Sequence, residues 1–480
     1  MKLSELLKNV NILSAAADMD TEIRGIRYDS RLVGEGDLFV AIKGFESDGH
    51  RFISKAMEQG AAAVLCQDIP EDCGIYVQTD DCRRALAMAS REFFGDPASE
   101  MVMIGITGTS GKTTTSYLIK HMLEQELGAK VGLIGTNGIM IGHELTHSER
   151  TTPESYELQM LFRRMADEGC THLVMEVSSH SLILDRVAGI HYNVAAYTNL
   201  SQDHLDFHGS MEEYARAKSL LFDRCDTGVF NIDDDYADTM MAGKKCRAIG
   251  CSAQGADAEL RAENISLSAA GVSFEAAYGG ERVKCSLAIP GMFSVYNALS
   301  VIGTGLSLGM SLYQCAHALS NAEGVKGRLE VVPTGRDYSV IIDYSHKPDA
   351  LEKVLKTLKP VTEGRLICLF GCGGDRDRLK RPIMGKIAAE NADFVIVTSD
   401  NPRTEEPNAI IAEIVSGLDG SLTPYKVICD REDAIYWALD NARQGDVILL
   451  AGKGHEDYQI IGHEKRHMDE RELVAGHLNK

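Results

Sequence analysis

One segment constrains the fold of this chain more than any other: an apolar run, then a glycine-rich loop, then a helical stretch. Residues 101–106 read MVMIGI, residues 108–114 read GTSGKTT, and residues 114–127 carry apolar side chains at helical spacing. Between a strand and a helix, such a loop presents backbone N–H groups and a helix N-terminus to phosphate. The segment therefore predicts a nucleotide-binding α/β domain.

The spacing of this loop departs from the full Walker pattern, because Ile106 stands where the first glycine belongs. A glycine-rich turn without a ligand is the alternative, but strand, loop and helix together favour phosphate binding. Lys112 would reach the β- and γ-phosphates, and the Thr113 hydroxyl would bind Mg²⁺. The residues expected to contact the nucleotide are Gly108, Thr109, Ser110, Gly111, Lys112, Thr113 and Thr114.

Apolar runs on both sides of the loop predict further α/β structure. Runs at 37–42 and 61–65 alternate with helical stretches before the turn at Gly95-Asp96-Pro97. After the loop, apolar runs alternate with helices, which predicts a parallel sheet covered on both faces. These runs lie at 131–134, 172–176, 194–198 and 228–232.

A new series of apolar runs after residue 326 predicts a Rossmann-like domain. Its runs lie at 339–344, 365–370, 393–398 and 446–451. The predicted fold class is α/β, with a small α/β domain at 1–97, a central P-loop ATPase-type domain with a parallel sheet at 98–326, and a C-terminal Rossmann-like domain at 327–480.

The composition excludes several classes of protein. The formal net charge of −21 opposes binding to nucleic acid or to an anionic membrane surface. Neither a signal-peptide core nor eighteen consecutive apolar residues occur, so we expect a soluble cytoplasmic protein without membrane insertion. The twelve cysteines lack zinc-knuckle or redox spacing and are expected to be reduced.

Glu176 follows the apolar run 171–175, at the carboxyl end of a predicted strand. Open α/β sheets place their ligand sites at this edge, and a carboxylate there suits Mg²⁺. A solvated glutamate at a strand end is the alternative. Because the phosphate loop shares the same predicted edge, a metal site is favoured.

Several motifs together resemble one family. The loop GTSGKTT is similar to the shortened phosphate loop of the Mur ligases and folylpolyglutamate synthetases. The motifs TTP at 151–153, MEVSSH at 175–180, NLSQDHLDFHG at 199–209 and DNPR at 400–403 narrow the resemblance to the Mur ligases that extend UDP-MurNAc-L-Ala-D-Glu. The resemblance spans all three domains. It implies a monomeric ligase that uses ATP and Mg²⁺ in peptidoglycan synthesis, and so in cell-wall biogenesis, cell shape and division.

The resemblance implies catalytic roles for Lys112, His204 and Lys218. His204 would lie at a second Mg²⁺ site, while His208 is expected to be structural. By helical spacing alone, Lys218 in EEYARAKSLLF would be an exposed lysine. The resemblance instead implies a lysine that reacts with CO₂ to give a carbamate, N6-carboxylysine. A carbamate offers Mg²⁺ two oxygen ligands, which an ammonium group cannot do.

The resemblance also assigns the nucleotide-linked substrate. Ser30 and the stretch 36–41 resemble the uridine-binding module of the family, although Asp29-Ser30 alone is typical of a turn. Arg186 is able to fork onto an anionic oxygen. The residues implied to hold UDP-MurNAc-L-Ala-D-Glu are Ser30, Thr151, Thr152, Ser178 and Arg186.

In the third domain the resemblance implies a site for meso-diaminopimelate, formed by Arg376, Asp400, Asn401, Pro402, Arg403, Gly452 and Glu456. This amino acid carries two carboxylates and two ammonium groups, which suit Arg376 with Arg403 and Asp400 with Glu456. Lysine lacks the distal carboxylate and would leave an arginine unpaired. DNPR after a strand is also an ordinary turn, but lysine-adding relatives differ at its arginine.

Four more residues resemble positions that contact ATP from the far side of a cleft: Asn297, Arg328, Asp343 and His346. ATP would then bridge the second and third domains, and closure would exclude water. A substrate carboxylate would attack the γ-phosphorus to give an acyl phosphate, and the amine would displace phosphate.

Three alternatives stay open at this level. A lysine-adding ligase or a folylpolyglutamate synthase would share the loop, His204 and Lys218. A nucleotide switch or binding protein would keep the loop without needing Glu176, His204 and Lys218. Phosphate release that depends on the amino acid separates these possibilities.

Overall fold

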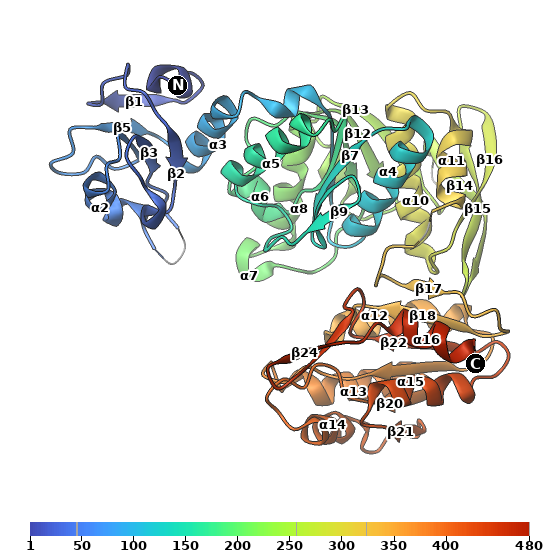
Figure 1. Ribbon diagram of the computed structural model, residues 1–480. Coiled ribbons are helices and arrows are strands. Elements are labelled where there is room, and N and C mark those ends of the chain that lie inside the picture. Colours follow the sequence, from blue (N-terminus) through green and yellow to red (C-terminus); the bar gives the residue numbers. More distant parts are fainter. Residues whose placement is uncertain (45–46, 256, 323, 480) are drawn as a thin grey trace. The chain divides into compact units, whose positions relative to one another are not determined.

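The computed structural model describes residues 1–44, 47–255, 257–322 and 324–479. The chain forms two compact units, Met1–Leu260 with Ser300–Ser311, and Arg261–Leu299 with Leu312–Lys480. The first unit holds the N-terminal sheet and the strands around the phosphate loop, and the second holds the C-terminal sheet (Figure 1). No helix among the described residues has the length and apolar character needed to cross a membrane.

The N-terminal sheet has the order β1-β5-β4-β3-β2 and is parallel except for β1. Apolar residues alternate between its two faces, so α1 and α3 cover one face and α2 covers the other. Its elements are α1 (Leu3–Leu6), β1 (Ile12–Ala15), β2 (Gly25–Arg27), β3 (Asp37–Val40), α2 (Ile53–Glu58), β4 (Ala63–Cys66), β5 (Tyr76–Thr79) and α3 (Cys82–Phe93).

The sheet of the phosphate loop has the order β13-β12-β11-β6-β10-β7-β8-β9 within the first unit. Its strands are β6 (Val102–Thr107), β7 (Val131–Gly135), β8 (Gly138–Ile141), β9 (Glu144–Thr146), β10 (His172–Glu176), β11 (Tyr192–Tyr197), β12 (Cys225–Asn231) and β13 (Arg247–Ser252). Strands β13 to β7 are mutually parallel, as predicted. The expectation of a purely parallel sheet was wrong at one edge, where β7, β8 and β9 form antiparallel hairpins.

Helices cover both faces of these parallel strands. The buried side chains of α5, α6 and α8 pack against one face, and α4 contacts β6, β7 and β10. The helices of this region are α4 (Lys112–Leu127), α5 (Ser155–Asp167), α6 (Ser179–Ile183), α7 (Leu205–His208), α8 (Met211–Ser219) and α9 (Ala237–Met241). In the sheet, Glu176 of β10 lies opposite Ile106 of β6, so the phosphate loop and Glu176 leave the same edge.

The C-terminal sheet of the second unit has the order β17-β18-β22-β19-β20-β21 and is parallel except for β17. Its strands are β17 (Glu330–Val332), β18 (Ser339–Asp343), β19 (Leu366–Phe370), β20 (Phe394–Val397), β21 (Tyr425–Val427) and β22 (Val447–Ala451). Helices α15 and α16 pack on one face, while α12, α13 and α14 contact the strands from the other (Figure 1). These helices are α12 (Pro348–Leu358), α13 (Lys380–Asn391), α14 (Pro407–Val415), α15 (Arg431–Asp440) and α16 (Glu470–Leu478).

The remaining elements are an antiparallel set of strands, a small hairpin and two helices. Strands β14 (Leu260–Ser268), β15 (Gly271–Tyr278) and β16 (Glu281–Leu287) are neighbours in the order β16-β15-β14. Strands β23 (Tyr458–Ile461) and β24 (Glu464–His467) form the hairpin, and the helices are α10 (Met292–Ser307) and α11 (Leu312–Ser320).

Candidate active site

The phosphate loop joins β6 to α4 with a backbone that glycine alone adopts readily. Gly108 has φ +148°, and a Cβ there would lie 1.9 Å from Thr198 Oγ1. Gly111, at the start of α4, has φ +85°. The Thr198 hydroxyl donates to the Ser110 carbonyl at 2.7 Å, so the loop is tied to the end of β11. The loop is therefore held at the carboxyl edge of the parallel strands.

Two lysines converge on this loop. Lys112 Nζ donates to the carbonyl oxygens of Gly108 (2.8 Å) and Thr109 (2.9 Å). Lys218 Nζ, from α8, donates to the same Gly108 oxygen at 2.9 Å. The Lys218 side chain is 2% exposed, which corrects the exposed position that helical spacing alone predicted. Burial, and then the nearby Lys112 charge, lower the pKa of Lys218 well below its usual value.

Tyr214 links Lys218 to the loop. It lies one turn before Lys218 on α8, and its ring centroid is 4.5 Å from Lys218 Nζ. The Tyr214 hydroxyl is 3.3 Å from Thr109 Oγ1. Thr109 in turn donates to the Ser201 carbonyl at 3.2 Å. Helix α8 is thus joined to the phosphate loop by a lysine and a tyrosine.

Histidines surround the start of α8. His204 has φ +53° and a side chain 48% exposed, and its ring lies 5.0 Å from the ring of His180. His208 Nε2 is 2.9 Å from Ser179 Oγ, and burial lowers the pKa of His208 to about 4. The expected structural role of His208 stays a prediction. The short helix α7 covers Leu205–His208, directly after His204.

Glu176 is fully buried at the end of β10. Its Oε1 accepts from the Thr136 N–H at 2.9 Å, and its Oε2 accepts from the Thr136 hydroxyl at 3.1 Å. Among the described residues, no group of three or more His, Cys, Asp or Glu side chains could hold a metal ion. The donors present fit Mg²⁺ only in combination with phosphate oxygens, because Glu176 and the Thr113 hydroxyl are two oxygen ligands where Mg²⁺ takes six.

The residues predicted to hold the dipeptide substrate gather beside Glu176. Thr152 Oγ1 donates to the Glu176 carbonyl at 2.8 Å and to Ser178 Oγ at 3.3 Å. Thr151 Oγ1 is 3.0 Å from the Thr136 hydroxyl. Arg186 Nη1 donates to the Thr152 carbonyl at 3.1 Å. These four predicted residues form one polar cluster at the strand edge that carries the phosphate loop.

Arg186 already has an acidic neighbour. Its Nε lies 2.9 Å from Glu154 Oε1, and burial lowers its pKa. An anionic substrate would have to share this guanidinium with Glu154.

Ser30 is the one predicted substrate residue in the N-terminal sheet region. It is buried, and it begins a short 3₁₀ helix that Asp29 caps by accepting from the Arg31 N–H. The adjacent Tyr28 hydroxyl donates to Glu157 Oε1 of α5 at 2.7 Å. The structure thus bears out the turn at Asp29-Ser30, and the role in uridine binding stays a prediction.

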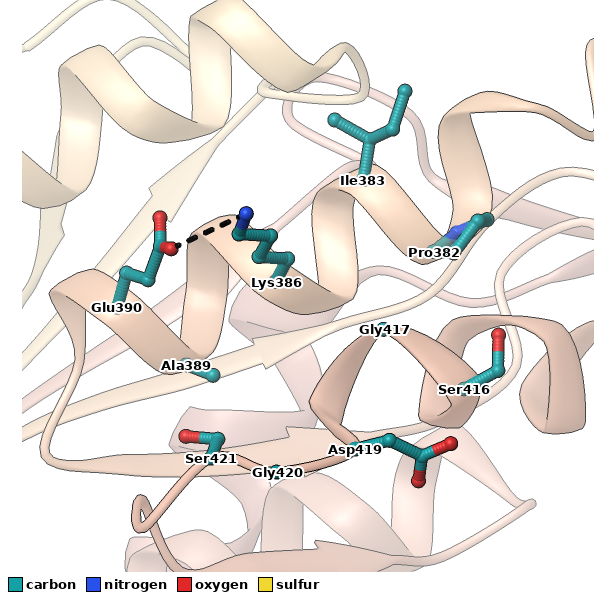
Figure 2. Close-up of a pocket in the computed structure, with 10 residues that line it drawn as sticks. All are labelled: Pro382, Ile383, Lys386, Ala389, Glu390, Ser416, Gly417, Asp419, Gly420 and Ser421. Atoms are coloured by element: carbon teal, nitrogen blue, oxygen red, sulfur yellow. Dashed lines mark ion pairs between the residues drawn. The ribbon is translucent and has the colours of Figure 1, made fainter.

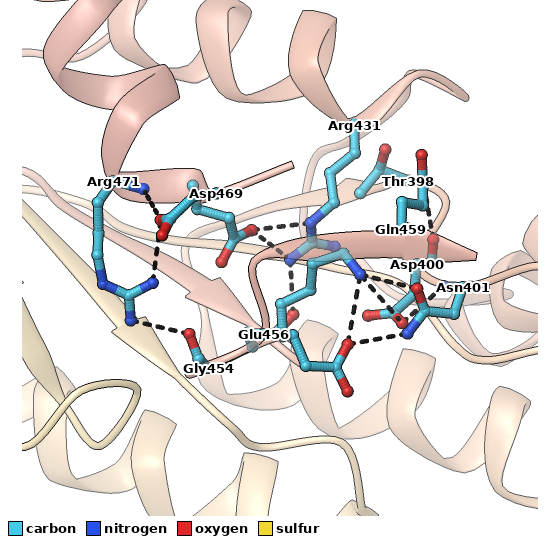
Figure 3. Close-up of polar contacts among 12 residues, drawn as sticks. Thr398, Asp400, Asn401, Arg431, Gly454, Glu456, Gln459, Asp469 and Arg471 are labelled. Atoms are coloured by element: carbon cyan, nitrogen blue, oxygen red, sulfur yellow. Dashed lines mark hydrogen bonds and ion pairs between the residues drawn. The ribbon is translucent and has the colours of Figure 1, made fainter. Parts of the chain in front are cut away.

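In the second unit, predicted ligand residues lie at the carboxyl ends of parallel strands of one sheet. Asp343 ends β18, Gly452 follows β22, and Asp400 lies just beyond β20. Asn401 Nδ2 donates to Glu456 Oε2 at 2.9 Å, and Figure 3 shows these two side chains facing each other. Gly452 has φ +116°, and a Cβ there would lie 2.8 Å from Asp400 Oδ2. Asp400, Asn401, Gly452 and Glu456 therefore form one cluster.

The two predicted carboxylate-binding arginines flank Gly373. A Cβ at Gly373 would lie 2.9 Å from Arg403 Nη1 and 3.8 Å from Arg376 Cγ. Arg403 follows Pro402, has φ +51°, and donates from Nη1 to the Gly374 carbonyl at 2.9 Å. Arg376 is exposed. The turn expected for DNPR is present, and it brings Arg403 to the loop that carries Arg376.

The other predicted ATP residues in this unit are mostly buried. Asp343 accepts from the Leu329 N–H at 2.8 Å and from the Ser345 hydroxyl, and burial raises its pKa. His346 Nδ1 is 2.9 Å from the Tyr344 carbonyl, and burial lowers the pKa of His346. The Arg328 guanidinium lies 5.4 Å from the Tyr344 ring centroid. Asn297 is buried, and its Nδ2 has no hydrogen-bond partner among the residues that the structure describes.

A separate pocket of about 550 Å³ lies between α13 and the turn after α14 (Figure 2). Lys386 and Glu390 on its rim form an ion pair at 3.8 Å. None of the predicted site residues lines it. We therefore do not assign it to the reaction.

Three family models match the chain in succession. They are the Mur ligase family, catalytic domain (residues 22–93), the Mur ligase middle domain (106–305) and the Mur ligase, glutamate ligase domain (327–454). A UDP-N-acetylmuramoyl-L-alanyl-D-glutamate–2,6-diaminopimelate ligase of Clostridium botulinum is 44% identical over 99% of both chains. The chain belongs to the Mur ligase family.

Other relatives and solved structures support the assignment of the chain to the Mur ligase family. A relative of the same description from Caldanaerobacter subterraneus is 47% identical over 99% of this chain and 98% of its own. A solved structure of a ligase with that description is 31% identical, with a TM-score of 0.78, over 100% of this chain and 99% of the other. MurF from Thermotoga maritima, solved with ADP, shares the fold at 19% identity and a TM-score of 0.58, over 91% and 94% of the two chains. As a Mur ligase, the protein is an ATP-dependent enzyme that forms amide bonds.

Sequence reasoning missed three side chains of this Mur ligase. Thr136 holds both oxygens of Glu176, Tyr214 joins Lys218 to the loop, and Lys453 lies among Asp400, Asn401 and Glu456. The position of Tyr214, four residues before Lys218, was a usable signal. Nothing local marked Thr136, because its partner Glu176 is 40 residues distant in the chain. Lys453 has Glu456 three residues further on, but its contact with Asn401 spans 52 residues.

Proposed function

We propose that this Mur ligase couples meso-diaminopimelate to UDP-MurNAc-L-Ala-D-Glu, with ATP as the energy source and an acyl phosphate as intermediate. The product would be the UDP-MurNAc-tripeptide of peptidoglycan synthesis. The observation that carries the proposal is the convergence of Lys112 and Lys218 on Gly108, beside a strand edge that also holds Glu176. The relatives with 44% and 47% identity support the choice of substrates.

ATP is proposed to bind with its phosphates on the loop from Gly108 to Thr114, where N–H groups at the start of α4 and the Lys112 ammonium offset negative charge. When bound, Mg²⁺ would offset charge on the phosphates, with Thr113, Glu176, His204 and the carbamate of Lys218 as its protein ligands. Asn297, Arg328, Asp343 and His346 are proposed as further ATP residues. The three domains are proposed to be 1–97, 98–326 and 327–480.

Lys218 is proposed to act as its carbamate. The reaction is that of a neutral amine with CO₂, in which an N–C bond forms and one proton is released. Burial favours the neutral amine over the ammonium, which is the form that reacts. Mass measurement of the intact protein in bicarbonate tests this step directly. An unmodified Lys218, together with full turnover of Lys218→Ala, would rule it out.

The substrate carboxylate is proposed to lie at the polar cluster of Thr151, Thr152, Ser178 and Arg186, with Ser30 on the uridine part. Hydrogen bonds among these residues and Glu176 fix their positions before substrate arrives. The side chains mainly position and stabilise charge, since attack on the γ-phosphorus needs little acid or base catalysis.

The incoming amino acid is proposed to bind at Arg376, Asp400, Asn401, Pro402, Arg403, Gly452 and Glu456. Arg403 and Arg376 flank one glycine, so both guanidinium groups are available for carboxylates. Asp400 and Glu456 would accept N–H bonds from an ammonium group. We further propose that the enzyme is a cytoplasmic monomer.

The decisive experiment measures phosphate release with ATP, Mg²⁺ and UDP-MurNAc-L-Ala-D-Glu, in the presence of meso-diaminopimelate or of lysine. We expect release that depends on meso-diaminopimelate and exceeds that with lysine at least about 10-fold, because an arginine left unpaired in a half-buried site costs about 1–3 kcal/mol. Equal rates with both amino acids would reject the choice of amine, and no rise with either would reject the proposed function.

A further inference from the structure

Lys453 is a fully buried lysine in the second unit, directly after β22, for which the reaction outlined above has no use. Its side chain is 0% exposed. Its Nζ donates to Asn401 Oδ1 at 3.0 Å and to the Tyr458 carbonyl at 2.8 Å. It also lies 3.5 Å from Glu456 Oε2 and 4.0 Å from Asp400 Oδ1. A buried ammonium is tolerated where it is paired and hydrogen-bonded, and both conditions are met here.

The contacts of Lys453 determine the orientation of the Asn401 side-chain amide, that is, which way its oxygen and its nitrogen point. An ammonium group and a backbone N–H can only donate, and Asn401 Oδ1 faces both Lys453 Nζ and the Ile460 N–H, at 3.0 and 2.9 Å. The amide oxygen must therefore point toward them. Its Nδ2 then points the other way and donates to Glu456 Oε2 at 2.9 Å. Figure 3 shows this Asn401 to Glu456 contact.

The charge of Lys453 has a second effect. Asp400 and Glu456 are two carboxylates within 4.0 Å of one ammonium group. Without the ammonium, these two carboxylates would lose their shared counter-charge, and their mutual repulsion would favour displacement of one of them. Because Lys453 is sealed from solvent, it cannot itself contact a substrate carboxylate. Its influence reaches the substrate through Asn401, Glu456 and Asp400.

We propose that Lys453 is a positioning residue, which orients the Asn401 amide and holds the Glu456 carboxylate in place, so that this carboxylate accepts the ammonium group of the incoming amino acid. The inference rests on the proposed function. It predicts that loss of Lys453 weakens binding of the amino acid and leaves binding of ATP and of the UDP-linked substrate unchanged.

The test compares the full-length wild type with Lys453→Met, which keeps the length and apolar stem but removes the charge and the donors. Lys453→Gln is the second variant, since its amide still donates one hydrogen bond into the buried site. Lys465→Met is the matched control: Lys465 is an exposed lysine of β24 that lies 3.7 Å from the ring centroid of the same Tyr458. For each protein, KM for meso-diaminopimelate, ATP and UDP-MurNAc-L-Ala-D-Glu, kcat and Tm are measured.

We expect KM for meso-diaminopimelate to rise at least about 10-fold in Lys453→Met and less in Lys453→Gln, with the other two KM values within about 2-fold and Lys465→Met like the wild type. An unchanged KM for the amino acid would overturn the proposal. Loss of folded protein in both variants, or an equal rise in all three KM values, would show a purely structural role and overturn it too. If the wild type itself releases no phosphate with meso-diaminopimelate, the proposed function fails, an outcome visible before any variant is compared.

Discussion

Lys112 and Lys218, 106 residues apart in the chain, donate hydrogen bonds to the same oxygen atom, the carbonyl oxygen of Gly108, at 2.8 and 2.9 Å. One of the two lysines belongs to the loop and helix expected to bind phosphate, and the other comes from α8 and is almost fully buried. The arrangement places a low-pKa amine beside a cation that is expected to contact phosphate. The chemistry proposed for Lys218 depends on this proximity.

Replacing Lys218 by methionine should stabilise the protein while removing its activity. A lysine whose pKa is lowered on folding binds fewer protons in the folded than in the unfolded state. It therefore destabilises the fold at pH values below its ordinary pKa of 10.5, and this penalty is lost as the pH rises through 10.5. In degassed buffer, Lys218→Met should have a higher Tm than the wild type at pH 7, and the gap should close toward pH 10.5.

The same variant should lose phosphate release by about 10²-fold or more, as for loss of a group that stabilises transition-state charge. Gly108 O keeps its bond from Lys112, so no buried carbonyl is left unpaired. Lys245→Met, at an exposed lysine of the same unit, should change neither property. A lower Tm for Lys218→Met at pH 7 would contradict a neutral Lys218.

Alanine at two glycines should separate backbone strain from the function of the loop. Gly128→Ala places a Cβ at φ +62° with nothing within 4 Å, so it should cost only about 1–2 kcal/mol of unfolding free energy. Gly108→Ala adds a clash at 1.9 Å with Thr198 Oγ1. We expect it to abolish ADP binding in calorimetry, because the loop must move. Wild-type ADP affinity in Gly108→Ala would argue against the role of this loop.

Arg403 should set the preference for an amino acid with a second carboxylate. In Arg403→Ala, KM for meso-diaminopimelate should rise at least about 10-fold, and the preference over lysine should fall by a similar factor. Arg378→Ala is the matched control, because Arg378 lies in the same loop as Arg376 but pairs with Glu413. Equal effects of Arg403→Ala on both amino acids would show that Arg403 does not distinguish them.

The acid stability of the second unit should depend on Arg381. This buried arginine contacts Glu405 Oε1 and Glu413 Oε2, each at 2.8 Å, and the pKa of Glu405 is lowered to about 2. A carboxyl with a lowered pKa stabilises the fold above its ordinary value of 4.5, and this stability is lost as the pH falls from 4.5 to about 2. Arg381→Met should therefore unfold with a shallower pH dependence in this range.

At pH 7, Arg381→Met should lower the unfolding free energy in urea by about 1–3 kcal/mol, because two carboxylates lose a charged donor. The control is Lys386→Met on the same helix, which removes an exposed ion pair with Glu390 and should cost less than about 1 kcal/mol. The prediction fails if the two variants have the same pH profile.

Much of the α/β framework could be predicted from apolar runs. The run at 101–106 became β6, the run at 172–176 matches β10, and four runs after residue 338 became β18, β19, β20 and β22. The hairpins of β8, β9 and β14 to β16 were not predicted. Strands β9, β14 and β16 are partly exposed and mix polar with apolar residues, so they lack the continuous apolar signal of buried parallel strands.

The amino-acid sequence by itself determined the phosphate loop. The strand, the helix and the two glycines between them are local features, and few residues other than glycine adopt the positive φ angles that the loop requires. Only the tertiary structure decided which side chains share that loop. Helical spacing predicted which residues share a face of α8. It did not predict that the face with Tyr214 and Lys218 contacts the phosphate loop at Gly108. Lys218 is buried because the packing of α8 brings it to Gly108, 110 residues away in the chain, and its low pKa follows from that burial. The same holds for Lys453, whose burial among Asp400, Asn401 and Glu456 arises where the segments that follow β20 and β22 come into contact.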